Sequence, residues 1–535
     1  MTILSRLTRR GFLEGVGGGL TLANLTAATS AGELRDSRLE SALDLRRRAA
    51  LAQSRRKIAS MKSNGDEKRY PDGSGCFTKG LPKGTHNEVD PKAYNALLRA
   101  IQTRSFSEFE KIPRAGGRRL SNPQSAFAFH MEGGDPHSFD IPAPPSMASQ
   151  QMETDVSELY WQALCRDIPF TAYSSSEITL RAAKGLKKTP ESLFRGSFSG
   201  SLKGPYISQF LLKSIPFGAT QVEQRYTVPA EGSDFMTTVS EWSQIQSGFP
   251  PWRTVEYDRV PRYLTTGRDL AEYAHYDFAH QAYLSAALIL INSSYRSLLN
   301  CNQYKSDNNP YRLSTVEEGF GTFGPAEAVD WIGRVVTPAL KAAYCQKWMV
   351  HRRIRPEELG GLIHFTRTKA KACPLHPSLL ESNAVDAVFA STGCYLLPQA
   401  FPEGCPMHPS YPAGHATIAG ACSVILKACF DGTMLLSGSV EVAPDRLSLR
   451  ECQGYSPTVG DEIDKLAFNV AMARNWAGIH YLSDDMAGLR LGEDVGLSVL
   501  QDLAQTFSEE FKGFFITRFD GSKVYVTPRG ELVPA

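Results

Sequence analysis

The sequence of 535 residues has no long apolar run and no excess of charge of either sign. No stretch of about 18 uninterrupted apolar residues occurs, so we expect no membrane-spanning helix. Lys and Arg total 58 against 56 for Asp and Glu, which leaves a net charge of +2. This balance gives no reason to expect a nucleic acid or an anionic membrane surface as a partner.

Several common metal and repeat patterns are also missing. No two of the ten cysteines have CxxC spacing, which argues against a zinc ribbon or a thioredoxin-like motif. The chain has no EF-hand-type calcium loop and no internal repeat of fixed period. With 42% apolar and 21% charged residues, the composition is that of an ordinary globular protein with a sizeable core.

Residues 1–31 have the pattern of an export signal. Arg9 and Arg10 precede a short, glycine-rich apolar stretch from Gly15 to Leu25, and small residues follow up to Ala31. A basic pair before such a stretch resembles a twin-arginine signal, whereas a disordered basic N-terminus is the alternative. We therefore expect a periplasmic or extracellular protein, in which disulfides can persist.

The rest of the chain predicts an all-α fold with a few small β-hairpins. Residues 32–150 combine a charged, helix-prone arm (Arg35–Lys62) with a Pro-, Ser- and Gly-rich wrap-around segment (Ser121–Gln151). Residues 151–535 predict a helical-bundle catalytic domain. Apolar residues recur at three- and four-residue steps in six of its windows, which are Thr154–Arg166, Asp269–Ile291, Pro325–Arg353, Ala416–Phe430, Gly460–Ala477 and Gly488–Phe511. Alternation at Val440–Leu449 and Phe514–Val526 predicts the hairpins.

Three clusters of basic residues and histidines lie at predicted helix ends. In the first, KWMVHRRIRP, eight residues separate Lys347 from Arg355. This is about two helical turns, so both side chains can reach one side of a single helix. Pro356 disfavours helix at Arg355 and is expected to end the element there. Taken alone, such a run is more often a solvated helix end.

The second cluster, HPSYPAGHAT, runs from His408 to Thr417 and places a rigid turn before a helix. The N-terminus of a helix offers free backbone N–H groups to an anion, and Gly414 allows close approach. Taken alone, this segment is more often a structural loop in which His408 and His415 are incidental.

The third cluster runs from Arg474 to Asp484. In a continuous helix Arg474 and His480 would face apart, but Gly478 is well suited to end the helix and let His480 turn back beside Arg474. Asp484 can then accept the second ring N–H of His480 and set its tautomer.

Together the three clusters predict one oxyanion site. Three cations and a helix N-terminus are what a tetrahedral oxyanion needs, and a carboxylate-oriented histidine adds a nucleophile or a metal ligand. Phosphate and vanadate share this shape and charge, so the cations alone do not separate a phosphatase from a vanadium enzyme.

The motifs K-x7-RP, PxGH and R-x5-H-x3-D resemble those of the vanadium-dependent haloperoxidases and of the related type 2 phosphatidic acid phosphatase and acid phosphatase group. KWMVHRRIRPEE, HPSYPAGHAT, GIHYLSDD, GDEKRYP and FTKGLPKG resemble the bromoperoxidase branch in particular. The resemblance extends from about residue 65 to the C-terminus. It implies a haloperoxidase that oxidises bromide or iodide with hydrogen peroxide and halogenates small organic nucleophiles, and it implies a homo-oligomer.

The resemblance also implies roles for individual residues. His480 would be the only protein ligand of vanadium, and His415 the acid–base group that helps to deprotonate hydrogen peroxide. His408 and Trp348 would lie near the path of the halide. Asp484 would orient His480. The vanadate oxygens would be neutralised by the side chains or backbone N–H groups of Lys347, Arg355, Gly414 and Arg474.

One position departs from the family. Relatives usually have serine before the Gly-His pair, where this chain has Ala413, so one hydroxyl donor to vanadate is missing. The phosphatase alternative also stays open at this point: His480 would then attack phosphorus and His415 would act as the general acid.

Overall fold

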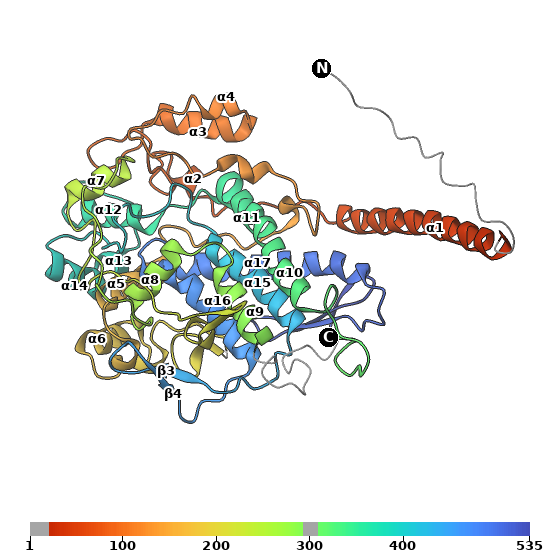
Figure 1. Ribbon diagram of the computed structural model, residues 1–535. Coiled ribbons are helices and arrows are strands. Elements are labelled where there is room, and N and C mark those ends of the chain that lie inside the picture. The colour runs from red at the N-terminus through yellow and green to blue at the C-terminus, as the bar shows by residue number, and fades with distance from the viewer. Residues whose placement is uncertain (1–20, 199, 293–308) are drawn as a thin grey trace, which may run out of the picture. The chain divides into compact units, whose positions relative to one another are not determined.

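The computed structural model describes residues 21–198, 200–292 and 309–535, with side chains from residue 35 onward (Figure 1). Arg9 and Arg10 of the expected export signal lie outside the described residues. Residue contacts divide the chain into two units, residues up to Arg55 and Arg56–Ala535. Residues 56–150 therefore belong to the same compact unit as the helical bundle.

The predicted all-α fold class is confirmed. The α-helices are α1 (Thr21–Ser54), α2 (Asp66–Arg69), α3 (Pro91–Thr103), α4 (Phe106–Phe109), α5 (Gln150–Cys165), α6 (Glu177–Leu186), α7 (Val239–Gln246), α8 (Gly267–Tyr276), α9 (Gln281–Asn292), α10 (Pro325–Arg334), α11 (Val336–Tyr344), α12 (Pro356–Arg367), α13 (Pro377–Leu380), α14 (Asn383–Thr392), α15 (Gly414–Cys429), α16 (Val459–Trp476) and α17 (Leu482–Leu503). In the part of the chain described, no helix combines the length and the apolar character needed to cross a membrane.

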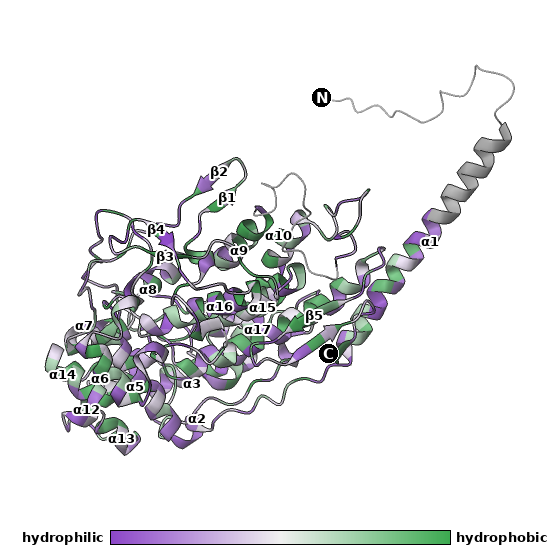
Figure 2. Cartoon of the chain, turned by 90° about the horizontal axis from the view of Figure 1, so that it is seen from below, coloured by the Kyte–Doolittle hydropathy of each residue, from purple (hydrophilic) through white to green (hydrophobic). Residues whose placement is uncertain are grey.

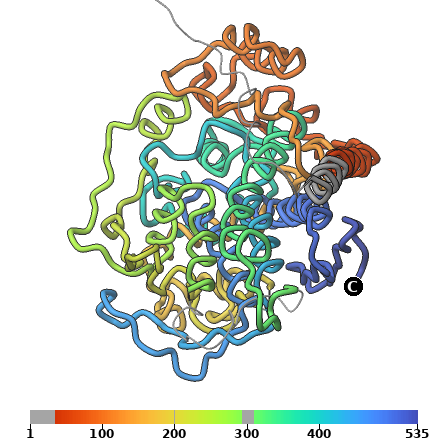
Figure 3. Tube along the Cα trace, turned by 45° about the vertical axis from the view of Figure 1, so that its right-hand side comes forward, coloured from red at the N-terminus to blue at the C-terminus, as the bar shows by residue number. Residues whose placement is uncertain are grey.

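Within the described residues, three small antiparallel sheets lie beside the helices. They consist of β1 (Ile215–Phe217) with β2 (Thr220–Val222), β3 (Val440–Val442) with β4 (Leu449–Glu451), and β5 (Phe514–Thr517) with β6 (Lys523–Val526) and β7 (Leu532–Pro534). The last two contain the predicted hairpins. Figure 3 shows the third sheet in dark blue near the C-terminus. Side chains of β5 alternate between buried and exposed, as one covered face requires.

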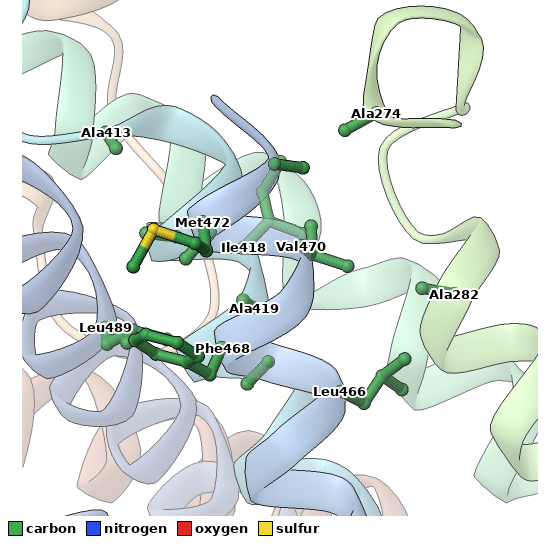
Figure 4. Close-up of a cluster of buried hydrophobic side chains, with 14 of the residues drawn as sticks. Ala274, Ala282, Ala413, Ile418, Ala419, Leu466, Phe468, Val470, Met472 and Leu489 are labelled. Atoms are coloured by element: carbon green, nitrogen blue, oxygen red, sulfur yellow. The ribbon is translucent and has the colours of Figure 1, made fainter. Parts of the chain in front are cut away.

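Helices α15, α16 and α17 form the centre of the bundle (Figure 1). Their apolar side chains meet in the cluster of Figure 4, which contains Ile418 of α15, Leu466 and Phe468 of α16, and Leu489 of α17. Figure 2 shows α9 and α15 as largely hydrophobic segments, as expected for helices that are buried on most sides.

Helices α15 and α17 approach closely because glycines line the contact. Gly488, Gly492 and Gly496 recur at four-residue steps on α17, so they share one face of that helix. A Cβ at Gly492 would collide with the carbonyl oxygen of Thr417, and one at Gly488 would lie 2.7 Å from that of Ala413. This close packing places the N-terminus of α15 next to the start of α17.

Two predicted helices are interrupted, and both interruptions place site residues. The window Asp269–Ile291 is two helices, α8 and α9, separated at residues 277–280. Asp277 caps α8 in an extended conformation with ψ 145°, and its side chain is held by His415. The window Pro325–Arg353 consists of α10, α11 and a π-helical turn at Cys345–His351.

The expectation that one helix carries both Lys347 and Arg355 is wrong. The turn that contains Lys347 ends at Arg352, which has φ 39°. Arg355 has extended backbone and is the N-cap of α12, so Pro356 begins a helix and does not end one. The reason is general: proline disfavours helix at the residue before it and is well accommodated at the first helical position.

The nine cysteines within the described residues are all free. Most of them are buried in the bundle, where they act as small apolar side chains.

Candidate active site

Lys347 and Arg355 form the fully buried cationic floor of the site. The Lys347 ammonium donates to the carbonyl oxygens of Pro409 (2.9 Å) and Ser410 (2.7 Å). Burial, together with the nearby Arg355 charge, lowers the pKa of Lys347 well below its usual range. Since two of the three ammonium hydrogens are used by carbonyls, one remains for a ligand.

Arg355, which belongs to the first sequence cluster, connects the second and third clusters. Its Nε donates to the carbonyl oxygen of His408 at 2.9 Å, and its Nη1 donates to that of Ile479 at 2.7 Å. Nη1 also lies 3.0 Å from His480 Nε2, and Nη2 lies 2.9 Å from His408 Nδ1. One guanidinium thus holds the backbone of both histidine-containing loops.

His480 follows the end of α16 as the sequence predicts. Gly478 has φ 81°, and the N–H of Ile479 bonds back to the carbonyl oxygen of Arg474 at 3.1 Å. His480 is 3% exposed, and its Nδ1 donates to Asp484 Oδ2 at 2.8 Å. This pairing leaves Nε2 with a lone pair, as a metal ligand requires. Burial and the charge of Arg355 lower the pKa of His480, which keeps the ring neutral.

Asp484 is held by more than His480. Its carboxylate accepts from Arg353 Nη1 at 2.6 Å, from the Ser410 hydroxyl, and from the Tyr481 backbone N–H at 3.1 Å. Burial alone would raise the pKa of Asp484, but the Arg353 charge and these hydrogen bonds hold it below its usual range. Asp484 therefore stays ionised and fixes the tautomer of His480.

The turn before α15 brings backbone donors to the same place. Gly414 is the first residue of α15, and the N-cap residue Ala413 has no side-chain oxygen to bond the free N–H groups. Ala413 is fully buried, and its backbone N–H donates to the Asp484 carbonyl oxygen at 3.0 Å. This bond attaches the turn to the start of α17.

His415 and Arg474 complete the site from the opposite side. His415 Nε2 lies 3.1 Å from Asp277 Oδ1, and its side chain is 29% exposed, more than the other site residues. Arg474 Nη1 donates to the Ala274 carbonyl oxygen of α8 at 2.6 Å. Burial lowers the pKa of Arg474 to about 10. The last turn of α8 thus contacts both the histidine and the third cation.

These groups surround a cavity of about 220 Å³. Leu340, Tyr344, Pro406 and Ile418 supply apolar wall, and the polar wall consists of Asp277, His408, Gly414, His415, Arg474 and His480. Ala413 and the two floor cations lie behind this wall. Residues of the second and third sequence clusters line this cavity, and Lys347 and Arg355 of the first cluster are hydrogen-bonded to the backbone of those two clusters.

Comparison with known proteins decides the family. Residues 394–509 match the model of the VCPO second helical-bundle domain. The chain is 34% identical to a vanadium-dependent bromoperoxidase of Ascophyllum nodosum, over 81% of this chain and 83% of that protein. It is 30% identical to one of Corallina officinalis, over 92% and 98% of the two chains. The chain belongs to the vanadium-dependent bromoperoxidases.

A solved structure of this family agrees with the fold. The homohexameric structure of the second vanadate-dependent bromoperoxidase from Ascophyllum nodosum superposes with a TM-score of 0.85 at 26% identity, covering 93% of each chain.

The site residues of this bromoperoxidase fit a tetrahedral oxyanion. Arg474 Nε is buried and has no hydrogen-bond partner among the described residues, which is costly unless a ligand satisfies it. His480 Nε2 has only the Arg355 guanidinium beside it, and the N-terminus of α15 has no side-chain cap. A vanadate ion would satisfy all three, with charge neutralised by the buried cations.

The expected place of Trp348 near the halide path is wrong. Its ring is fully buried in a separate apolar cluster, where it meets Phe77 edge-on at 5.9 Å, and it does not line the cavity. Neighbouring side chains on a helical turn point in different directions, so Lys347 and Trp348 cannot both face the site. His408 does line the cavity, with the Tyr344 ring 5.4 Å away, and its place near the halide stays a prediction.

Replacing Trp348 with Phe should therefore change stability and not halide use. We expect the KM for bromide to stay at its parent value, while the free energy of unfolding falls by about 0.5–3 kcal/mol, as is usual for a core substitution. Steady-state kinetics and urea unfolding measure the two quantities. A KM that rises severalfold at unchanged stability would restore Trp348 to the halide path.

Three supporting residues were not predicted from the sequence. Arg353 and Ser410 both lie inside motifs that the sequence analysis identified. Their hydrogen bonds to Asp484 were not predicted. Asp277 lies 138 positions from His415 in the chain, and only the fold brings the two together. No pattern in the sequence marks it.

Proposed function

We propose that this bromoperoxidase binds vanadate in the cavity between His415 and His480 and oxidises bromide or iodide with hydrogen peroxide. The observation that supports this best is the neutral, carboxylate-oriented His480, whose Nε2 lone pair lies 3.0 Å from the Arg355 guanidinium in a cavity that Arg474 also lines. Bound vanadate would supply Lewis-acid activation of hydrogen peroxide without a change in oxidation state.

Each group around the cavity has a separate task. His480 Nε2 would bind the metal. The N–H donors of Lys347, Arg355, Arg474 and Gly414 would neutralise the oxyanion and hold its orientation. Hypohalous acid or an equivalent would leave the cavity and halogenate small organic nucleophiles.

His415 is placed to move protons. Its ring is more exposed than that of His480 and lines the cavity, so an incoming peroxide can reach it. Asp277 Oδ1 accepts from Nε2, which turns Nδ1 into a proton acceptor. His415 would take a proton from hydrogen peroxide and return it to a departing oxygen.

Bromination of a phenol-red-type dye tests this function. Dye bromination should need bromide, hydrogen peroxide and added vanadate together, and metal analysis should find about one vanadium per subunit. Hydrolysis of a phosphate monoester, with no dye bromination after vanadate loading, would instead identify the phosphatase chemistry that the cation cluster also permits.

The substitution Ala413→Ser should strengthen vanadate binding. A hydroxyl at the N-cap of α15 can donate to a vanadate oxygen, and a hydrogen bond to a charged group contributes roughly 1.5–3 kcal/mol. Since water can replace part of it, we expect the lower end, or a half-saturating vanadate concentration about tenfold lower. A side-by-side titration with vanadate measures this. An unchanged titration with a raised unfolding midpoint would show that the serine caps the helix instead.

We also propose export through the twin-arginine pathway. Changing Arg9 and Arg10 to Lys in the full chain should leave the protein in the cytoplasm of a bacterial host, because the receptor recognises the arginine pair. Cell fractionation with an immunoblot measures the distribution. Equal export of the parent and the double variant would contradict the proposal.

We propose that the protein is a homo-oligomer. The proposal is supported by the homohexameric relative, which covers 93% of this chain at a TM-score of 0.85. Light scattering on the purified protein gives its mass directly, and a monomer at micromolar concentration would contradict the proposal.

A further inference from the structure

A second cavity adjoins the active site and shares the lining residue Asp277 with it. Its volume is about 310 Å³, within the range of roughly 300–1,000 Å³ that small-molecule sites occupy. Four tyrosines supply much of its wall. Two come from the chain before α8 and two from α8 itself, and they are Tyr226, Tyr257, Tyr273 and Tyr276.

The inner wall of this tyrosine cavity is preformed. The rings of Tyr226 and Tyr273 meet edge to face, with centroids 5.2 Å apart and an interplanar angle of 80°. Tyr273 is 6% exposed, and the Tyr226 hydroxyl donates to Gln224 Oε1 at 2.6 Å. Because the rings cannot turn freely, they present fixed aromatic surface to a flat, apolar ligand.

One corner of the cavity is polar. The Tyr257 hydroxyl donates to Glu272 Oε1 at 2.8 Å, and the hydroxyl oxygens of Tyr257 and Tyr276 lie 3.3 Å apart. Glu272 is buried, and its other oxygen lies 3.4 Å from His275 Nδ1. Tyr257 donates its only hydroxyl hydrogen to the carboxylate, so its oxygen is an acceptor that a ligand hydroxyl can use in place of the Tyr276 hydroxyl.

We propose that the tyrosine cavity binds the organic acceptor of the halogenation, and that this acceptor is an electron-rich aromatic compound of the phenol class. The acceptor ring packs against Tyr226, Tyr273 and Tyr276, and its hydroxyl donates to the Tyr257 oxygen. The inference rests on the proposed bromoperoxidase function, which supplies the oxidant in the adjoining cavity.

The reaction balances with groups already named. A ring carbon ortho or para to the hydroxyl gives an electron pair to the bromine of hypobromous acid, so that a C–Br bond forms and the O–Br bond breaks. The departing hydroxide takes the ring proton and becomes water. Carbon is oxidised and bromine reduced, and no further oxidant is needed. The hydrogen bond to Tyr257, reinforced by Glu272, draws the phenol proton away and enriches the ring in electrons.

Two variants of the cavity and one control separate acceptor binding from halide oxidation. Tyr276→Ala removes a wall residue that is 70% exposed, and Tyr257→Phe removes only the accepting oxygen. The control Phe515→Ala removes an aromatic ring that is 53% exposed on β5 and lines neither cavity. Each variant is assayed for triiodide formation without an acceptor, and for phenol bromination over a range of phenol concentrations.

We expect triiodide formation to match the parent in all three variants. For Tyr276→Ala the KM for phenol should rise about three- to tenfold, as the loss of one aromatic contact implies. For Tyr257→Phe the KM should rise for phenol but not for its methyl ether, which has no proton to donate. The control should leave both KM values unchanged.

Two results would overturn the inference. One is phenol bromination that never saturates and has the same rate in every variant, which indicates a freely diffusing oxidant. The other is bromine on Tyr257 or Tyr276 in the mass spectrum with unaltered phenol kinetics, which makes the cavity a target of the oxidant. If the parent forms no triiodide, the proposed bromoperoxidase function fails. An NMR titration with phenol then tests acceptor binding by itself. The parent must bind phenol more tightly than Tyr276→Ala does, and equal affinities would overturn the inference.

Discussion

His480→Ala is expected to abolish both vanadate binding and vanadate-dependent bromination. His480 Nε2 carries a lone pair, lines the cavity and lies 3.0 Å from the Arg355 guanidinium, so it can bind the metal directly. The cations and the backbone N–H groups are donors to oxygen and cannot replace a metal–nitrogen bond. Vanadium content after loading and dialysis, together with dye bromination at saturating vanadate, measures the effect.

The fold should survive this change. Asp484 keeps its bonds from Arg353, Ser410 and the Tyr481 backbone, so its carboxylate does not become an unpaired buried charge. Circular dichroism should therefore match that of the parent.

Asp484→Asn should give a graded result, about 10–100-fold weaker vanadate binding, because the ligand remains but its orientation is lost.

A histidine away from the cavity provides the matched control. His86 has a side chain that is 39% exposed, and His86→Ala should bind vanadate and brominate dye at the parent level. Vanadate-dependent turnover that persists in His480→Ala would show that another group binds the metal.

His415→Ala is expected to lower turnover by about 10²–10⁴-fold, which is the usual contribution of a general acid–base group. The imidazole lines the cavity, and its hydrogen bond is to Asp277 and not to His480 or the floor cations, so vanadate should still bind. The expected pattern is thus the reverse of that for His480→Ala: normal vanadium content with little bromination. Metal analysis and peroxide-dependent kinetics on the same preparation measure both.

Asp277→Asn tests the positioning of His415. The imidazole remains but loses its ionised partner, so turnover should fall by less than in His415→Ala, again with vanadium retained. A variant of His415 that loses vanadium, yet turns over normally when saturated with it, would mean that this histidine binds the oxyanion and does not move protons.

The sequence by itself predicted the elements on which the site depends. Strong three- and four-residue periodicity predicted the central helices α15 and α16, because helices buried on this scale need long apolar faces. Gly478 predicted the turn that brings His480 back, since glycine readily adopts the φ of 81° found there. Helix periodicity and the glycine turn depend on residues that are close together in the chain, so the sequence alone is enough to predict them.

The tertiary structure decided which helix Pro356 belongs to and where the Trp348 side chain lies, neither of which local sequence patterns determine. Pro356 could end one helix or begin the next, and only the packing of α12 showed that it begins one and that Arg355 is its N-cap. Trp348 could face the halide or the core, and only the apolar cluster around Phe77 placed it in the core.

The partnership of His415 with Asp277 was likewise beyond the sequence, because the break between α8 and α9 had no glycine or proline to mark it. Long-range contacts depend on how helices cross, and helix crossing depends on side chains from distant segments at once. Residue types and spacing therefore predicted the chemistry, and the packing of α8 and α12 against the central helices determined which side chains lie around the cavity.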